Sequence, residues 1–330
     1  MILVTGATGH LGNVLVRLLV VSNKKVRVLV LPNEDLKPLE DLNVEIVRGD
    51  VRDFEAVNKA CKNVEVVYHL AAVISIFGKS KLVYEVNVEG TKNVLRACMK
   101  NRVSRMLYVS SVHAFAELAK GSLIDENVPI DPKLVTGHYA KSKAMATQEV
   151  LKAVKEGFDA VLIFPTGIIG PYDWRLSEMG SLIVYFCGGM LKLAVGGGFD
   201  FVDVRDVAKA MILALEKADR GEKFILSGEY VTIRALIEML ERIVGKKPRV
   251  IFLPNWTAYL VAMAAIPYYK LKNQKPLLTF YSVFALSRGY IYSNQKARQK
   301  LDFSPMPVFE SLKDAVDWFA ENGYVVTRSR

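Results

Sequence analysis

The feature that most constrains the fold is the start of the chain, where a short apolar segment runs into three regularly spaced glycines. Residues 2–5 predict a buried strand, and the leucines of residues 11–19 predict the apolar face of a helix. Between them, Gly6 permits a tight turn, Gly9 leaves room for a phosphate, and Gly12 lets the helix pack closely on the strand. The helix N-terminus would then face an anion. The pattern predicts a phosphate site, with an ordinary strand-to-helix turn as the alternative.

Apolar strands and amphipathic helices alternate along the first half of the chain. Strands are predicted at residues 2–5, 26–30, 44–47, 66–70, 106–110 and 160–164, and helices at residues 10–21, 53–60, 81–100 and 137–156. Connections of this length favour right-handed crossovers between parallel strands. The predicted fold class is α/β, a Rossmann-type doubly wound parallel sheet.

The alternation loosens beyond residue 164, where glycine-rich loops and helices follow. A βαβ-like stretch over residues 199–226 is expected to return to the sheet, so we predict a dinucleotide-binding domain of residues 1–170 and 199–227. A smaller, mostly C-terminal, α-rich substrate-binding region then comprises residues 171–198 and 228–330. Its helices are predicted at residues 234–244, 256–266 and 312–319.

Composition narrows the partners and the compartment. The chain has 330 residues, and its 44 basic and 34 acidic residues give a net charge of +10, which favours anionic ligands in general. No block of like charges occurs, so nucleic acid is not expected. Cys61, Cys98 and Cys187 are too far apart for a disulfide framework or a zinc site, and no metal is expected. With no secretory signal before the first strand, a cytoplasmic location is expected.

Two apolar stretches, residues 181–195 and 256–266, raise the question of a membrane. Both are shorter than the roughly 20 residues that a spanning helix needs. Core helices or an apolar pocket wall are therefore expected. Tyrosines and lysines at residues 268–272 follow the second stretch, which leaves contact with a membrane surface as the less favoured alternative.

A tyrosine and a lysine mark the predicted chemistry. Tyr139 and Lys143 are four residues apart in a predicted helix, so the phenol and the ammonium share one face. A free phenol has a pKa of about 10, and a neighbouring positive charge favours the phenolate. Such pairs are common on solvated helices, but Ser110 and Ser111 end the preceding strand, at the sheet edge where a hydroxyl can lie beside a substrate oxygen.

These motifs together resemble the extended short-chain dehydrogenase/reductase family, also called the NAD-dependent epimerase/dehydratase superfamily, and within it the dihydroflavonol-4-reductase-like branch. The resemblance runs nearly end to end. The segments that carry it are residues 5–12, 49–52, 68–72, 87–91, 108–111, 164–171 and 201–208. The resemblance implies hydride transfer by a nicotinamide cofactor, with the protein supplying orientation and a proton.

The resemblance also implies the residues of the site. The cofactor-binding residues are Gly6, Thr8, Gly9, His10, Leu11, Gly12, Asp50, Val51, Leu70, Ala71, Ala72, Lys143 and Pro165, with Asp50 at the adenine. Tyr139 would exchange a proton with the substrate oxygen, Ser111 would hydrogen-bond that oxygen, and Lys143 would lower the phenol pKa and hold the nicotinamide ribose. Asn87 would position a water or the active-site backbone, or is instead a satisfied buried amide.

The choice between NADP and NAD stays open, with a slight preference for NADP. The strand over residues 26–30 is followed by Leu31, where NAD enzymes normally carry a carboxylate. The arginine that related NADP enzymes often carry there is missing as well. Lys37 could reach a 2′-phosphate, whereas Glu34 and Asp35 would favour NAD if their loop folded back.

The favoured function is reduction of a hydrophobic ketone or aldehyde to an alcohol. Related enzymes for nucleotide sugars carry a diphosphate-binding arginine where this chain has Phe199, although Arg175 or Arg205 could compensate. The alternatives are a nucleotide-sugar epimerase or dehydratase with tightly bound NAD, and a non-catalytic nicotinamide-binding regulatory protein. Family members commonly dimerise through helices that correspond to residues 81–100 and 137–156, so a homodimer acting on a small molecule is expected.

Overall fold

A seven-stranded sheet with the order β11-β7-β5-β4-β1-β2-β3 forms the centre of the computed structural model, which describes residues 1–74, 80–254, 257 and 280–325. All of its pairings are parallel. The strands are β1 (Ile2–Thr5), β2 (Val26–Val30), β3 (Glu45–Arg48), β4 (Val66–His69), β5 (Arg105–Val109), β7 (Ala160–Pro165) and β11 (Lys223–Leu226). The predicted fold class is confirmed, and the six predicted strands form within one residue of their predicted bounds.

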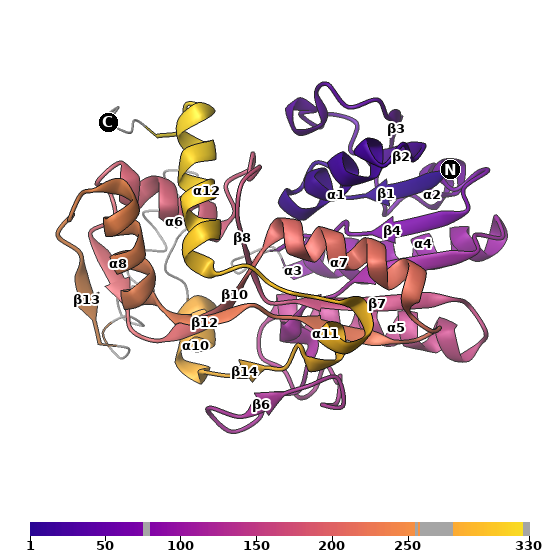
Figure 1. Ribbon diagram of the computed structural model, residues 1–330. Coiled ribbons are helices and arrows are strands. Elements are labelled where there is room, and N and C mark those ends of the chain that lie inside the picture. The colour runs from indigo at the N-terminus through magenta and orange to yellow at the C-terminus, as the bar shows by residue number, and fades with distance from the viewer. Residues whose placement is uncertain (75–79, 255–256, 258–279, 326–330) are drawn as a thin grey trace.

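Helices cover both faces of this sheet, as a doubly wound fold requires (Figure 1). One face carries α1 (His10–Val21), α7 (Val204–Lys217) and α11 (Gln295–Leu301), and the other carries α2 (Phe54–Ala60), α4 (Gly90–Lys100) and α5 (His138–Lys155). The strand order changes direction between β1 and β4. Ligands of such sheets bind outside the carboxyl ends of the strands at this switch point.

The predicted helix over residues 81–100 is wrong in one respect, because it is not a single regular helix. It divides into α3 (Ser80–Tyr84), a π-helical turn η2 (Glu85–Glu89) and α4. Asn87 lies in this turn and is only 1% exposed. A π turn inserts one residue into the helical repeat, and such turns are frequent at functional sites.

A second lobe lies beside the carboxyl edge of the sheet (Figure 1). Its sheets are β8 (Gly167–Ile169), β10 (Gly198–Asp203) and β12 (Glu229–Thr232), and the pair β9 (Leu193–Val195) and β13 (Ile251–Leu253). Its helices are α6 (Glu178–Cys187), α8 (Ile233–Val244), α10 (Phe280–Arg288) and α12 (Val308–Glu321). The remaining elements are β6 (Leu123–Ile124) paired with β14 (Ile291–Tyr292), and the short turns η1 (Lys37–Leu39) and η3 (Val112–Ala114).

The packing differs from the predicted domain boundaries in two places. Strand β11 returns to the main sheet as expected, but β10 pairs with β8 and β12 instead. In addition, Ala297, Leu301 and Phe303 are buried in the core beneath α1 and α7. These residues fall within the predicted substrate-binding region of residues 228–330, but their apolar side chains complete the core of the nucleotide-binding lobe.

The apolar stretch over residues 181–195 supplies α6 and β9, and Ile183 and Phe186 are buried in the second lobe. Within the described part of the chain, no helix is both long and apolar enough to cross a bilayer. The other apolar stretch, 256–266, and the tyrosines and lysines at 268–272 lie outside the described residues, apart from Thr257.

Candidate active site

The parallel strands bring most of the predicted site to one edge. The loops that follow β1, β3, β4 and β5 all emerge there, because the carboxyl ends of parallel strands lie at the same side of a sheet. Helix α5 carries Tyr139 and Lys143 to the same edge, and it packs against η3, which follows Ser111. Pro165, the last residue of β7, is buried within the sheet opposite Leu226.

The glycine loop fits a dinucleotide phosphate. Gly6 has a φ of +72°, and a Cβ there would lie 2.7 Å from the backbone nitrogen of Ala71, while a Cβ on Gly12 would lie 2.1 Å from the carbonyl oxygen of Gly6. Internal packing therefore requires both glycines. Gly9 differs, since a Cβ there would contact only the Gly6 oxygen, at 3.3 Å. Gly9 caps α1 without a side-chain hydrogen bond, so its open side suits an anion bound to the helix N-terminus.

Two other residues of this loop have partners within the protein. The ring of His10 donates from Nε2 to the carbonyl oxygen of Pro171 (2.9 Å). The side chain of Asn13 donates to Tyr172 O (3.1 Å), which adds a second tie between α1 and the segment after β8. Leu11 is buried at 8% exposure and packs in the core beside the sheet. The glycine loop is thus anchored to the second lobe.

A buried histidine that the sequence analysis did not single out links the loop to α4. Thr91 donates to the carbonyl oxygen of Asn87 (2.6 Å), so His69 must donate from Nε2 to the Thr91 hydroxyl (3.0 Å). His69 Nδ1 then accepts from Thr5 (2.7 Å), whose oxygen accepts from the N–H of Ala71 (3.2 Å). Burial lowers the pKa of His69 to about 3, so the ring is neutral. The hydrogen bonds therefore all run in one direction, from the N–H of Ala71 through Thr5, His69 and Thr91 to the carbonyl oxygen of Asn87.

The hydroxyl of Ser111 lies close enough to the phenol of Tyr139 that it acts to lower the pKa of the phenol. Burial nonetheless raises the pKa of Tyr139 to about 12, because desolvation of the phenolate outweighs the effect of Ser111. The expected lowering of this pKa by Lys143 is therefore not present in the protein alone. Ser110 points elsewhere and bonds to Thr147 (2.7 Å), which leaves Ser111 as the hydroxyl at the site.

Lys143 lies deep in the site, where it is 3% exposed. Its ammonium donates to the carbonyl oxygen of Val109 (2.7 Å) and lies 5.0 Å from the centre of the Tyr108 ring. Burial lowers the pKa of Lys143 to about 7. A buried ammonium with one carbonyl partner has donor capacity left for a ligand hydroxyl.

Asn87 is a fully bonded buried amide that spans two elements of the site. Its Oδ1 accepts from the N–H of Val73 (2.7 Å), and its Nδ2 donates to Val73 O (3.1 Å) and to Ser142 Oγ (2.9 Å). Ser142 in turn donates to the carbonyl oxygen of Tyr139 (2.7 Å). Asn87 therefore joins the segment after β4 to the helix that carries the tyrosine.

The predicted adenine residues lie at the end of β3. Asp50 forms an ion pair with Arg52 (2.7 Å), and the hydrogen bond from Arg52 lowers the pKa of Asp50, so this group is a carboxylate. Val51 is buried beside Gly90, where a Cβ would lie 2.8 Å from Val51 Cγ2. Leu70, Ala71 and Ala72 follow β4 directly, and Leu70 N–H donates to Thr5 O (3.2 Å).

An aromatic cavity adjoins Ser111 on the side of the second lobe. It is lined by Val112, His113, Phe115, Phe199, Arg288 and Tyr292, among others. The ring of Phe199 stacks on His113 with the centroids 5.5 Å apart, and His113 lies 6.2 Å from the ring of Tyr139. Burial lowers the pKa of His113 to about 4, so this ring is neutral. Arg288 is paired with Glu117 (3.3 Å), and this ion pair lines the cavity together with the aromatic rings.

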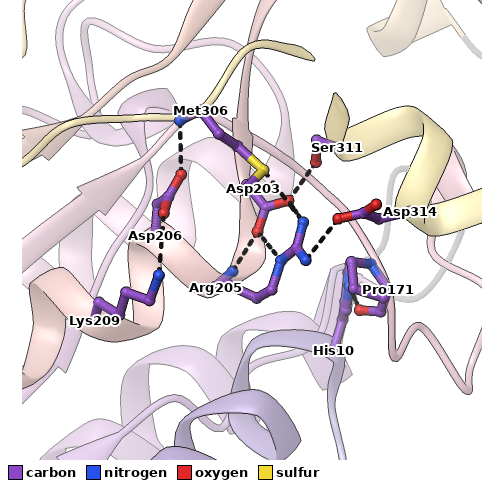
Figure 2. Close-up of polar contacts among 9 residues, drawn as sticks. All are labelled: His10, Pro171, Asp203, Arg205, Asp206, Lys209, Met306, Ser311 and Asp314. Carbon is purple, nitrogen blue, oxygen red and sulfur yellow. Dashed lines mark hydrogen bonds and ion pairs between the residues drawn. The ribbon is translucent and has the colours of Figure 1, made fainter. Parts of the chain in front are cut away.

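Two arginines, Arg175 and Arg205, could replace the diphosphate ligand that is missing at Phe199. Both are already paired with carboxylates. Figure 2 shows the guanidinium of Arg205 between Asp203 (2.8 Å) and Asp314 (2.7 Å), with Ser311 donating to the Asp203 oxygen that also accepts from Arg205. These two ion pairs raise the pKa of Arg205, so the group stays charged. Arg175 forms an ion pair with Glu34.

Comparison with known proteins extends the resemblance to a shared family. Residues 3–232 match the 3-beta hydroxysteroid dehydrogenase/isomerase family. Sterol demethylase protein B of Methylococcus capsulatus is 32% identical over 98% of this chain and 99% of its own length. A Synechocystis protein named for dihydroflavonol 4-reductase is 30% identical over 98% and 96% of the two chains.

Solved structures give the same result for the fold. The crystal structure of gox2253 superposes with a TM-score of 0.86 at 31% identity and covers 99% of both chains. The dTDP-glucose 4,6-dehydratase DesIV of Streptomyces venezuelae, solved with NAD bound, has a TM-score of 0.81 at 20% identity over 98% of both chains. The second likeness shows that the fold is shared with enzymes of nucleotide sugars.

Proposed function

Because this chain belongs to the 3-beta hydroxysteroid dehydrogenase/isomerase family of NAD(P)-dependent short-chain dehydrogenases/reductases, we propose that it reduces a hydrophobic ketone or aldehyde to the alcohol. The observation that carries this proposal is the stacked pair of Phe199 and His113 beside Tyr139. The resemblance implies that related enzymes for nucleotide sugars carry a diphosphate-binding arginine at the position of Phe199. The stacked aromatic rings instead favour an apolar substrate.

The proposed chemistry divides between cofactor and protein. The glycine loop and Lys143 would hold a reduced nicotinamide cofactor, which would supply hydride to the carbonyl carbon when bound. Tyr139 gives its phenolic proton to the carbonyl oxygen as the carbon–oxygen double bond becomes single. Ser111 donates a hydrogen bond to the same oxygen and stabilises the negative charge that develops there. Solvent then returns a proton to Tyr139, so that one carbonyl, one hydride and one proton make one alcohol.

Burial raises the pKa of Tyr139 to about 12, so the phenol is protonated at neutral pH in the protein alone. General acid catalysis is most efficient when the pKa of the donor lies near the working pH, so we expect positive charge beside the phenol to lower its pKa in the complex. The reverse reaction needs the phenolate, which positive charge beside Tyr139 would favour. Lys143 is the side chain that we expect to provide it when the ribose hydroxyls restore partners to its ammonium.

The test follows the absorbance of reduced nicotinamide with a panel of hydrophobic ketones and aldehydes. Wild-type protein should oxidise the cofactor, and Tyr139→Phe should lower kcat by a factor of about 100 or more, since the proton donor is lost. Tyr230→Phe, at an exposed tyrosine of β12, is the matched control and should retain activity. No oxidation by the wild-type protein across the panel would refute the reductase proposal.

The second candidate is a nucleotide-sugar epimerase or dehydratase, which the shared fold with DesIV favours. Its substrate needs cations for two phosphates, and in the described part of the chain the arginines nearest to the position of Phe199 are paired with carboxylates. Turnover of a nucleotide sugar without net change in nicotinamide absorbance would establish this alternative instead.

Three finer properties stay predictions. A homodimer would use the faces of α3, α4 and α5, and the location would be cytoplasmic. The slight preference for NADP depends on Leu31, which follows β2 directly where NAD enzymes normally carry a carboxylate. The alternative, a preference for NAD, would use Glu34, which accepts a hydrogen bond from Thr8 (3.1 Å).

A further inference from the structure

The ammonium of Lys143 lies over an aromatic ring that the chemistry described so far does not use. The ring belongs to Tyr108 of β5, and its centre is 5.0 Å from Lys143 Nζ. Both residues are buried, Tyr108 with 1% and Lys143 with 3% exposure. The same nitrogen donates to the carbonyl oxygen of Val109 (2.7 Å). The ammonium thus has a carbonyl oxygen and a ring as its partners, and the negative face of such a ring attracts a cation.

The other titratable groups around Lys143 offer it no negative charge. They come from four further elements and are His69 of β4, Tyr139 of α5, His113 of η3 and Glu178 of α6. Burial raises the pKa of both phenols and lowers the pKa of both imidazoles, so all four rings are neutral at pH 7. Glu178 is exposed and acts on Tyr139. No carboxylate of the described part of the chain forms an ion pair with Lys143.

Neighbouring strands fix the ring of Tyr108 in place. Tyr108 is opposite His69 in the register of β5 and β4, and the two ring centres are 5.7 Å apart. His69 is held in turn by the hydroxyls of Thr5 and Thr91. The hydroxyl of Tyr108 has no hydrogen-bond partner in the part of the chain that the structure describes. The contact with Lys143 is therefore made by the ring and does not need the hydroxyl.

The charge of Lys143 at neutral pH depends on contacts of this strength. Burial lowers the pKa of Lys143 to about 7, so the ammonium and the free amine are present in similar amounts at that pH. A cation–π contact between desolvated groups can shift such an equilibrium by about tenfold. Only the ammonium carries the positive charge that favours the phenolate of Tyr139.

We propose that Tyr108 is a positioning residue, whose ring holds the ammonium of Lys143 in place and keeps it charged at neutral pH. The proposal rests on the reductase function proposed above, in which Lys143 holds the nicotinamide ribose and acts on Tyr139. Tyr108 acts through Lys143 and not by contact with the substrate.

The direct test is the titration of Lys143 itself, which needs no turnover. In protein labelled with ¹³C at the lysine Cε atoms, the NMR signal of Lys143 is the one that Lys143→Met lacks. It should titrate near pH 7 in the wild type, well below exposed lysines at about 10.4. Tyr108→Leu replaces the ring with an aliphatic side chain, so the midpoint should fall by about one pH unit. Tyr108→Phe keeps the ring and should titrate as the wild type does.

Tyr68→Leu is the matched control. Tyr68 belongs to the neighbouring strand β4 and is also 1% exposed, but it packs in the core on the opposite face of the sheet. Its replacement should lower the melting temperature, as Tyr108→Leu does, and leave the titration of Lys143 unchanged. If Tyr108→Leu does not fold, Tyr108→Phe with a trifluorinated ring keeps the shape and weakens the negative ring face. The midpoint should then fall as well.

Turnover provides the second measurement. The reaction needs the ammonium, which is lost as the pH rises through its pKa, so the alkaline limb of kcat/KM should move to lower pH in Tyr108→Leu. A midpoint that stays unchanged or rises in Tyr108→Leu or in the trifluorinated variant would overturn the role of Tyr108 and leave the reductase proposal standing. A lower midpoint in a protein that oxidises no reduced nicotinamide would support the contact and refute the reductase function.

Discussion

The burial of Lys143 has a consequence for the stability of the protein. Its pKa falls from the usual 10.5 to about 7 on burial, so between these two pH values the unfolded chain binds more protons than the folded one. The free energy of unfolding therefore rises with pH across that window. Tyr139 acts in the opposite direction only above pH 10, since its pKa is raised rather than lowered.

We predict that Lys143→Met removes this slope. Between pH 7 and pH 10 the free energy of unfolding of the wild type should rise by roughly 2–4 kcal/mol relative to the variant, at about 1.4 kcal/mol per pH unit where the slope is greatest. Urea denaturation at pH 7, 8.5 and 10 measures this difference. Because only Lys143 differs, other titrating groups cancel, and parallel curves for the two proteins would show that its pKa is normal.

Some residues of the candidate site could be predicted from the sequence and others could not. Ser111, Tyr139 and Lys143 could be chosen because strand ends and helical spacing place them without tertiary information. Glu34 could not be placed, since its role depends on a loop folding back onto Thr8 and Arg175. His69 carried no distinctive signal, because its function lies in a chain of buried hydrogen bonds between segments far apart in sequence.

At the scale of elements, strands with continuous apolar runs could be predicted almost to the residue, because burial on both faces requires that composition. The interruption of the helix at Glu85–Glu89 could not be predicted, since amphipathic periodicity continues through it. Asn87 lies in this π turn, and its side-chain amide forms hydrogen bonds with both Val73 and Ser142. These partners are far from Asn87 in sequence, so sequence periodicity does not reveal them.

Replacing Asn87 with alanine should therefore affect both stability and turnover. The change leaves the backbone groups of Val73 and the hydroxyl of Ser142 short of partners, which should cost about 2–4 kcal/mol. It also frees the segment beside the cofactor, so kcat should fall by a factor of about ten or more. Asn101→Ala, at the other end of α4, removes comparable amide bonds and should lower stability alone. Equal kcat in both variants would contradict a positioning role for Asn87.

At the scale of the whole molecule, the two lobes depend on each other. Leu301 is fully buried in the core beneath α7, although it lies late in the chain, between α10 and α12 of the second lobe. Leu301→Ala should lower the free energy of unfolding by about 2–5 kcal/mol. Leu134→Ala, at a leucine that is 51% exposed, should change it by less than about 1 kcal/mol.

The two lobes should also unfold together. Far-UV circular dichroism reports all helices. Tryptophan fluorescence reports on Trp174 and Trp318, which are packed against each other in the second lobe. Circular dichroism and fluorescence should give coincident urea transitions in the wild type and in Leu301→Ala. Separate transitions would show that the lobes are independent folding units.

The late position of α11 has a consequence for a chain that is still being synthesised. Translation proceeds at about 5–20 residues per second, and β1 leaves the ribosome long before Phe303 does. Until then, the underside of α7 lacks the residues that cover it, and the outer edge of β7 also waits for β11. The nucleotide-binding lobe, whose first strand comes at the start of the sequence, can complete its core only after residues 295–303 have emerged.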